Sequence, residues 1–274
     1  MFYTTKADIN REKELLLRQP DSYLSRIDYE GQGVISKVGN DITLTPVISP
    51  TFVTNAYQSA VGLNLICQNS AGDCVIGKIK SNSVTAIVFD STLSRKTKDG
   101  VIGAPADWTT GGTVNFYVMT PHATYLWGDY FGVVKEPDIS FEEEYASVED
   151  SVDGIIAEGL IRVNLDVTGQ NKNITNSDVL TSVLNLTPQG SQSGSYELHG
   201  GFRPAARKKF RITFAGKTDD EKDFLLQYFK CKFRAEGSIS PNGEDYAQVG
   251  WGLKPYRDSL RNEAVNAYMI KIQK

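Results

Sequence analysis

Several segments of this 274-residue chain hold residues that could do chemistry, and each lacks a part of the corresponding motif. Residues 72–78 have the spacing of a phosphate-binding loop, but Ile79 stands where a Ser or Thr must bind magnesium. Residues 190–194 have the spacing of a nucleophile elbow, with Gln192 in place of the serine. A Ser-His-Asp triad would have to use one of only two histidines, and no acidic residue stands out to orient either.

Carboxylates and cysteines also give no catalytic or metal signature. Glu142-Glu143-Glu144 could supply the paired acids of a glycosidase, but Glu142 and Glu144 share a strand face that Glu143 does not. Three cysteines and two histidines are too few and too scattered for a structural zinc site. Cys67 and Cys74 could close a hairpin if oxidised, and we favour two buried thiols. We therefore expect no enzyme activity, no metal and no cofactor.

Composition predicts a folded, non-membrane protein. The chain is 40% hydrophobic and 23% charged, which excludes global disorder. It has no apolar run of about 18 residues, the length of a membrane span, and residues 1–13 lack the pattern of a signal peptide. We expect a protein that is made in a cytoplasm and stays soluble until it assembles.

The net charge of −4 conceals three segments of different charge. Residues 1–128 are neutral, and residues 169–274 carry 16 basic and 11 acidic residues, a net charge of +5. Residues 129–168 carry 2 basic and 11 acidic residues, a net charge of −9. An acidic sheet face repels itself unless it meets water, cations or a basic partner. Three arrangements remain open: the basic strands are that partner within the subunit, they are that partner across a subunit interface, or both faces are solvated.

The elements that must position these charges are mostly strands. From about residue 31 to residue 119, short runs rich in Val, Ile, Phe and Tyr alternate with turn residues, which is typical of a sandwich or barrel. In the second half, alternation of apolar and polar residues predicts an antiparallel sheet with one buried face. Its expected strands are residues 130–134, 138–145, 160–168, 209–214, 230–236 and 268–272.

Three helices and one loop are predicted. Asp8 can cap a helix over residues 9–18, whose Leu15, Leu16 and Leu17 would form the contacts of an N-terminal arm. Thr175 can cap a helix over residues 176–186. A capping box at residues 218–221 predicts a helix that ends near Phe229. The Gly- and Ser-rich residues 188–201 predict a loop.

The second half resembles a known family in the order of its elements. Residues 128–135 lead into Asp138-Ile139-Ser140-Phe141-Glu142-Glu143-Glu144, and an acidic loop with Asp153-Gly154 follows. Then come the strand over residues 160–168 and a helix that starts Thr175-Asn176-Ser177-Asp178. Over about residues 120–274 this order is similar to the tail tube (major tail) proteins of long-tailed bacteriophages.

The resemblance implies a virion structural protein without catalysis. In that family, six β-sandwich or barrel subunits close into a ring, and stacked rings form a hollow tube for DNA. It implies partners among its own copies and other tail proteins, with DNA passing through without sequence-specific binding and no membrane. An acidic lumen makes physical sense because carboxylates repel phosphates. The implied lumen-facing candidates are Asp138, Ser140, Glu142, Glu144 and Asp166. The candidates for contacts between rings or subunits are Glu149, Asp150, Asp153, Lys209, Arg211, Lys230, Lys232 and Arg234.

We therefore expect a mainly β chain with an antiparallel sandwich or barrel of tail-tube type and one or two flanking helices. Residues 1–30 would form an arm, residues 31–120 an extra β-rich domain and residues 121–274 the tail-tube-like domain. The extra domain leaves open a tail-tip, neck, baseplate or decoration protein, or a surface module that binds through Trp108, Trp127 and Trp251. A nucleic-acid binder that uses the basic strands is a third alternative.

Overall fold

The computed structural model is almost entirely antiparallel β-structure. One sheet contains fifteen strands and a second contains two. Among the described residues, helical conformation occurs at Thr181, Val183 and Leu184. The mainly β, antiparallel fold class is therefore confirmed. The structure describes residues 20–48, 52–70, 74–90, 95–96, 108, 110–122, 127–150, 154–172, 181, 183–184, 186–192, 195–199, 208–217, 223–234, 239–242, 245–260 and 268–272.

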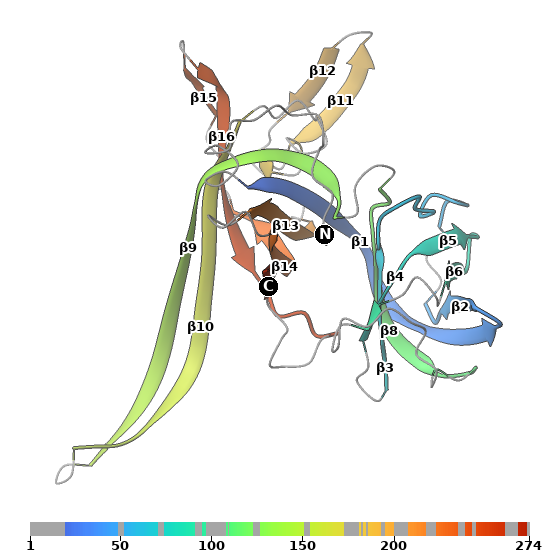
Figure 1. The fold of residues 1–274 in the computed structure, drawn as a ribbon, viewed down its shortest axis with the longest axis horizontal. Helices are drawn as coiled ribbons and strands as arrows, with labels where there is room; N and C mark the ends of the chain where they lie inside the picture. Colours follow the sequence, from blue (N-terminus) through green and yellow to red (C-terminus); the bar gives the residue numbers. More distant parts are fainter. Residues whose placement is uncertain are drawn as a thin grey trace.

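One long strand, β1 (Asp21–Val38), joins two groups of strands (Figure 1). Its first half pairs with β13 (Lys209–Lys217) on one side and with the start of β9 (Asp129–Asp150) on the other. Its second half pairs with β2 (Asp41–Pro46) and β8 (Thr113–Met119). Each half of β1 thus belongs to a different group, and the sheet runs through both.

The first group surrounds its own apolar core. From β1 the pairings run through β2 and β6 to β5, and in the other direction through β8 and β3 to β4 and β7. Only Lys78 separates β4 from β5, so the chain itself connects the two series. Buried side chains such as Leu44, Leu65 and Phe116 fill the space between them. The remaining strands of this group are β3 (Leu65–Asn69), β4 (Cys74–Gly77), β5 (Ile79–Asn82), β6 (Ile87–Asp90) and β7 (Arg95–Lys96).

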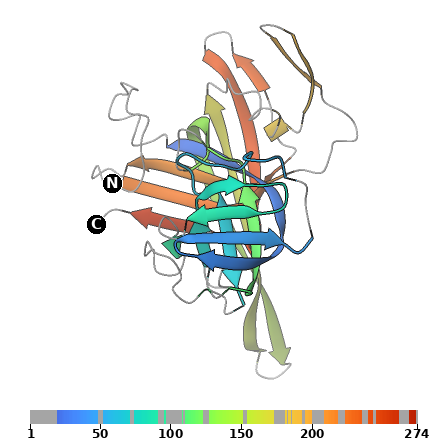
Figure 2. The same ribbon diagram turned by 90° about the vertical axis from the view of Figure 1, so that its right-hand side faces the viewer.

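The second group lies beside the first, and its consecutive strands pair as β9–β10, β11–β12, β13–β14 and β15–β16 (Figures 1 and 2). From β1 the pairings run through β13, β14, β16, β10 and β9 and lead back to β1. β17 pairs with β14, β15 with β16, and β11 with β12. These strands are β10 (Gly154–Lys172), β11 (Thr187–Gln192), β12 (Ser195–His199), β14 (Asp223–Phe233), β15 (Ile239–Asn242), β16 (Asp245–Pro255) and β17 (Tyr268–Ile272).

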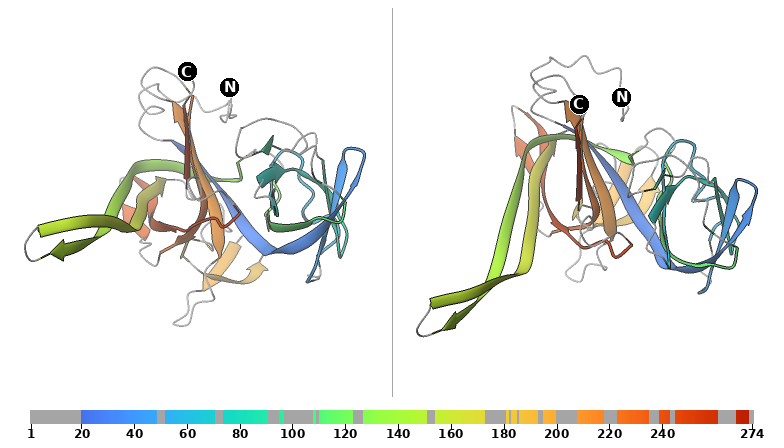
Figure 3. Two further views of the ribbon diagram at one scale, coloured as in Figure 1. Left: turned by 90° about the horizontal axis from the view of Figure 1, so that it is seen from below. Right: turned by 60° about the horizontal axis from the view of Figure 1, so that its bottom comes forward.

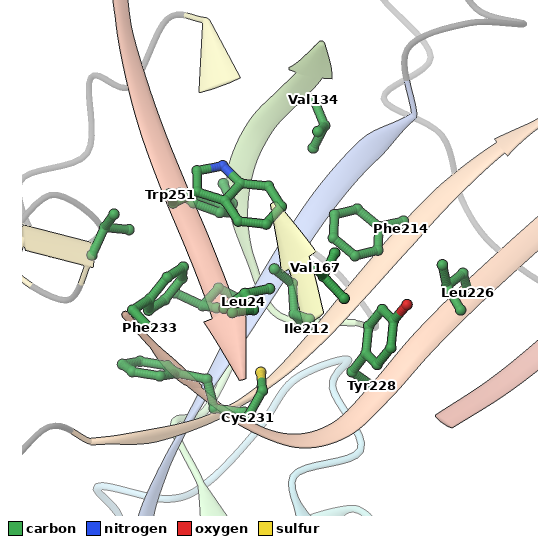
Figure 4. Close-up of a cluster of buried hydrophobic side chains, with 14 of the residues drawn as sticks. Leu24, Val134, Val167, Ile212, Phe214, Leu226, Tyr228, Cys231, Phe233 and Trp251 are labelled. Carbon is green, nitrogen blue, oxygen red and sulfur yellow. Dashed lines mark hydrogen bonds between the residues drawn. The ribbon is translucent and has the colours of Figure 1, made fainter. Parts of the chain in front are cut away.

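Aromatic side chains dominate the core of the second group (Figure 4). The ring of Trp251 stacks on Phe214 at 6.1 Å between centroids, and Phe131 and Phe233 pack around it. Gly169 lies directly beneath the indole, where an added Cβ would come within 2.7 Å of the Trp251 ring. The absence of a side chain at Gly169 therefore lets β10 approach the aromatic cluster closely.

The helix predicted from the capping box at residues 218–221 is wrong where the structure describes the chain. Residues 223–233 form β14, which pairs with β13, β16 and β17. Leu226 and Tyr228 lie in the core of the second group, whereas Leu225 packs on the opposite face with Tyr23 and Trp127. A strand buried on both faces reads as a continuous apolar run, which period alone cannot distinguish from a buried helix.

Other predicted elements differ in extent. The loop predicted over residues 188–201 is wrong where it is described, because β11 and β12 pair as a hairpin there. The two strands predicted over residues 130–145 are one strand, β9. Within the helix predicted over residues 176–186, Thr181, Val183 and Leu184 are helical. Val183 is buried against the aromatic core.

β1 also crosses the predicted boundary between residues 30 and 31, so residues 21–30 pair within the sheet and not as part of an arm. Residues 1–19, with the predicted helix and Leu15, Leu16 and Leu17, lie outside the described residues. The division into an extra β-rich region and a tail-tube-like region stays a prediction.

Candidate functional site

The hairpin of β9 and β10 projects from the rest of the chain (Figures 1 and 3). Its register runs from Val133 opposite Lys172 at the root to Asp150 opposite Gly154 at the tip. β1 pairs with β9 only as far as Val133, and β16 pairs with β10 only from Val167 onward. Beyond these points, each strand of the hairpin has only the other as a partner among the described residues. The hairpin therefore presents two open edges.

The register assigns the positions of this hairpin to two faces. Residues directly opposite each other in an antiparallel pair share a face, and positions alternate along each strand. One face holds Asp138, Ser140, Glu142 and Glu144, opposite Thr168, Asp166, Asn164 and Arg162. The other face holds Ile139, Phe141 and Glu143, opposite Val167, Leu165 and Val163. Over residues 138–144 and 162–168, the positions of the hairpin are thus polar and mainly acidic on one face and mainly apolar on the other.

The root of the hairpin anchors these two faces to the core. Val167 is fully buried in the aromatic core, whereas Thr168 is exposed and Asp166 is partly exposed. Because alternation along a strand is fixed, the apolar row that starts at Val167 continues to Leu165 and Val163, beyond the last residue that pairs with β16. These apolar positions lie outside the group of strands that covers Val167.

The predicted lumen residues Asp138, Ser140, Glu142, Glu144 and Asp166 therefore share one face of one hairpin. That this face lines a lumen stays a prediction. Glu149 and Asp150 lie at the tip end of β9, and Asp153 is outside the described residues.

Two of the predicted basic contact residues, Lys209 and Lys230, form ion pairs with Glu30 of the same chain. Lys209 Nζ lies 3.0 Å from one carboxylate oxygen of Glu30, and Lys230 Nζ lies 2.8 Å from the other. Lys230 also lies 5.3 Å above the centre of the Tyr117 ring. Burial raises the pKa of Glu30, but hydrogen bonds from both lysines and their positive charges outweigh it and hold that pKa below its ordinary value. Glu30 thus connects β1 electrostatically to β13 and β14.

Arg234 and Lys232 have different surroundings. The Arg234 guanidinium forms an ion pair with the Asp166 carboxylate, which joins the end of β14 to the root of the hairpin. Lys232 Nζ lies 5.5 Å above the Tyr256 ring, and its residue is directly opposite Lys254 in the register of β14 and β16. Of these two predicted contact residues, Arg234 already has an acidic partner within the chain. Contacts of either residue with another subunit stay a prediction.

Arg211 is fully buried and belongs to a polar network between the two groups of strands. Its guanidinium donates to Ser25 Oγ at 3.2 Å, and Ser25 Oγ donates to the Trp127 carbonyl at 3.0 Å. His122 Nε2 lies 3.1 Å from the same hydroxyl oxygen, and His122 Nδ1 lies 3.4 Å from Asp129 Oδ1. Because Arg211 is buried at this point, it connects β13 to β1 within the subunit and has no surface to offer to a second subunit in this conformation.

The contacts Ser25–His122–Asp129 follow the order of a catalytic triad, which the sequence patterns did not reveal. In the sequence, Asp129 is one of the acids of the segment of residues 129–168. Its position seven residues after His122 is the one sequence signal for this contact. The Ser25 side chain is fully buried and already bonded to the Trp127 carbonyl, so a substrate would have to displace part of the packed junction to reach it. The geometry supports a structural connection between β1 and the loop before β9.

A polar cleft of about 380 Å³ opens between the two groups of strands. Glu30 and Lys230 supply its charges, Gln32, Asn115 and Tyr117 supply neutral polar groups, and Phe116 and Leu260 form an apolar part of its wall. Beside this cleft, the Tyr117 hydroxyl donates to the buried carboxylate of Asp258 at 2.9 Å. The cleft is thus polar and already contains a charged pair.

The cysteines and tryptophans are core residues. Cys67 packs in the core of the first group, whereas Cys74 packs with Ile66 on the opposite face of the β3–β4 hairpin, so the two side chains point away from each other. Burial raises the pKa of the Cys67 thiol well above its ordinary value. The three tryptophans Trp108, Trp127 and Trp251 are all buried, each in a different cluster, and they form no common binding surface.

No model of a known protein family matches this chain, and a search of curated proteins returns no significant match. The described residues hold no helix of the length and apolar character that crossing a membrane requires. Within the same residues, no three His, Cys, Asp or Glu side chains gather as metal ligands would.

Proposed function

We propose that this chain is a virion structural protein, a subunit of a phage tail tube that assembles into stacked sixfold rings. The observation that carries the proposal is the projecting β9–β10 hairpin, whose two edges have no strand partner among the described residues. Open edges are templates for pairing with another chain, and closure across subunits removes them. The same hairpin of neighbouring copies is a matched partner because all copies have the same length and register.

The two faces of the hairpin support the same assembly. A two-stranded hairpin is at best marginally stable alone in water, and a row of apolar positions extends from Val167 beyond the group of strands that covers it. In a ring, neighbouring copies would pair along the open edges and cover the apolar face. The acidic face would then line the inside, where carboxylates repel the phosphates of passing DNA. The circuit of strands from β1 through β13, β14, β16, β10 and β9 would form the barrel of each subunit on the outside of this wall.

Electron microscopy of the purified full chain tests the proposal. Hollow rings or tubes with a pore wide enough for duplex DNA are the expected result, in a protein found in the tail of the virion and made in the host cytoplasm. A chain that stays monomeric at high concentration, with no ring in the particle, would overturn it. In particles, Glu142→Lys/Glu144→Lys should leave tubes intact but impair DNA ejection. Loss of assembly in that variant would place the acidic face at an interface instead.

A single specialised ring is the second candidate, such as a tail-tip, neck or baseplate component. The observation that favours it is the first group of strands, which the resembled family lacks and which β1 joins directly to the second group. Labelling the chain in intact particles separates the two: a tube subunit is labelled along the whole tail, and a terminal component at one end.

A further inference from the structure

A row of amide side chains crosses the first group on the face opposite its core. Gln32 of β1 lies directly opposite Asn115 of β8, and Asn115 lies directly opposite Gln68 of β3. The neighbouring Phe116 and Cys67 fill the core of the first group, so the three amides point away from that core. Gln32 is exposed, and the other two are partly exposed. Three adjacent strands thus present amide groups to solvent.

The polar cleft lies at one end of this amide row. Gln32 and Asn115 belong to its wall, and Glu30 lies two residues before Gln32 on the same face of β1. The wall also includes the exposed Ser259 and the apolar Leu260. Its volume of about 380 Å³ is within the range of about 300–1,000 Å³ that is typical of small-molecule sites.

Glu30 supplies this cleft with a hydrogen-bond acceptor whose orientation is fixed. Lys230 and Lys209 contact its carboxylate oxygens at 2.8, 3.0 and 3.3 Å. A carboxylate has about four acceptor sites, and these contacts use three of them. The Glu30 side chain is 35% exposed, whereas Lys230 is buried. Glu30 can therefore accept a hydrogen bond from a ligand, and Lys230 positions Glu30 without reaching the ligand itself.

The chain that follows β16 is also fixed where it lines the cleft. The Tyr117 hydroxyl and the Leu260 backbone N–H both donate to the buried Asp258 carboxylate, at 2.9 and 3.2 Å. Ser259 lies between these two anchored residues and keeps its own side chain exposed. Polar groups that are held in place before binding lose little conformational freedom when a ligand arrives.

The charges of the cleft discriminate between classes of ligand. Two lysines share the one carboxylate of Glu30, so a cation is repelled there. An anion would meet the exposed carboxylate of Glu30, because Lys230 is buried. Amide groups both donate and accept hydrogen bonds, as hydroxyl groups do. A neutral ligand that carries several hydroxyl groups therefore matches the cleft best.

We propose that the cleft is a binding site for a neutral saccharide. One sugar ring occupies the cleft, where its hydroxyl groups donate to Glu30 and exchange hydrogen bonds with Gln32 and Asn115. A second ring of the same saccharide lies along the amide row at Gln68. The site is complete within one chain, so this function goes beyond the proposed tube and does not depend on ring formation.

Titration of the purified full chain with D-glucose, D-galactose, D-mannose, N-acetyl-D-glucosamine, maltose and chitobiose tests the site by saturation-transfer difference NMR. At least one of these sugars should bind. Gln32→Ala/Asn115→Ala should weaken that binding about tenfold or more, because hydrogen bonds to the sugar are lost. Gln58→Ala removes an exposed glutamine that does not line the cleft and should bind like the wild type. Equal urea midpoints of the two variants would show that the fold is intact.

Two further variants separate the possible outcomes. Ser259→Trp fills the cleft and should abolish binding, and Glu30→Gln should weaken it. Absence of binding by every sugar, or binding that neither Gln32→Ala/Asn115→Ala nor Ser259→Trp changes, overturns the proposal. Inorganic phosphate that displaces the sugar, and binds more tightly to Glu30→Gln, would assign the cleft to an anion and also overturn it. None of these results bears on the tube proposal, which electron microscopy tests independently.

Discussion

At the scale of single residues, charged side chains meet where the two groups of strands join, and two of them, Lys230 and Asp258, are buried there with a hydrogen-bonded partner. Glu30 accepts hydrogen bonds from Lys209 and Lys230, and Asp258 accepts one from Tyr117. A buried charge that loses its partner costs far more than the pair contributes. These contacts therefore specify how β1 and β8 lie against β13 and β14.

Glu30→Gln should lower the free energy of unfolding by about 1–3 kcal/mol. Gln keeps the shape but leaves the buried Lys230 ammonium without a carboxylate. Urea unfolding of the two proteins measures the difference. Lys80→Met removes the exposed pair with Asp41 and should cost less than about 1 kcal/mol, which makes it the matched control. Equal effects of the two substitutions would contradict the assignment of Glu30 to the junction.

The contribution of Glu30 to the free energy of unfolding should depend on pH. The pKa of Glu30 is lowered from its ordinary 4.5 in the folded chain, so the folded state favours the charged form. Its contribution is present above pH 4.5 and is lost as the pH falls through the lowered pKa. The difference in unfolding free energy between wild type and Glu30→Gln should be constant near neutral pH and shrink below pH 4.5. A difference that grows on acidification would contradict this sign.

Gly169→Ala should destabilise the chain by about 1–3 kcal/mol, because the added methyl group meets the Trp251 ring. The near-ultraviolet circular dichroism of the aromatic cluster should change with it. Gly39→Ala is the control: its φ of 60° imposes backbone strain, but an added Cβ there meets nothing within 4 Å. An unchanged aromatic signal in Gly169→Ala would show that β10 does not depend on this close approach.

At the scale of elements, the sequence predicted strands best where one face is polar. Alternation placed β2, β13 and the root of β10 correctly, because polar and apolar residues alternate along each of them; in β13 the polar residues Arg211 and Thr213 are nevertheless buried. It failed for β14, whose residues are buried on both faces, and missed the first half of β1 for the same reason. The acidic hairpin face was predictable from period 2, whereas Glu30 and the Ser25–His122–Asp129 network depend on contacts between distant residues.

Shortening the hairpin should separate folding from assembly. A chain in which a two-residue Asn-Gly turn replaces residues 141–165 closes the hairpin at the pair Ser140–Asp166 and keeps the root that pairs with β1 and β16. Its unfolding free energy should stay close to the wild-type value, because the removed part pairs only with itself among the described residues. Rings should be absent by electron microscopy. Rings of normal diameter formed by the shortened chain would contradict the proposed role of the hairpin edges.

At the scale of the whole molecule, β1 makes the two groups of strands one cooperative unit. The same strand contributes Leu24 to the aromatic core and Ile35 to the core of the first group. If β1 detached from either group, the strands that pair with it in that group would be left with an open edge. The chain thus contains two apolar cores but a single continuous sheet.

Unfolding should therefore occur in one transition seen by probes in both cores. Cys67 reports on the first core and Cys231 on the second, and both thiols are fully buried. The urea midpoints for labelling each thiol should coincide. Ile42→Ala, in the first core, should lower both midpoints together. Labelling of Cys67 well before Cys231 would show two separately folding units.

The pairing of β1 with β13 also sets an order of events during synthesis. The second half of β1 finds β2 and β8 once residue 119 has emerged, but the edge of its first half waits for β13, whose first residue is Lys209. About 90 further residues take roughly 5–20 s to translate. During that interval, Tyr23 and Leu24 can pair with β9 but lie on a strand whose other edge is still open. Incomplete chains on neighbouring ribosomes of one messenger RNA therefore expose the same open strand edge and are able to pair with one another. They must be kept apart until β13 has been synthesised.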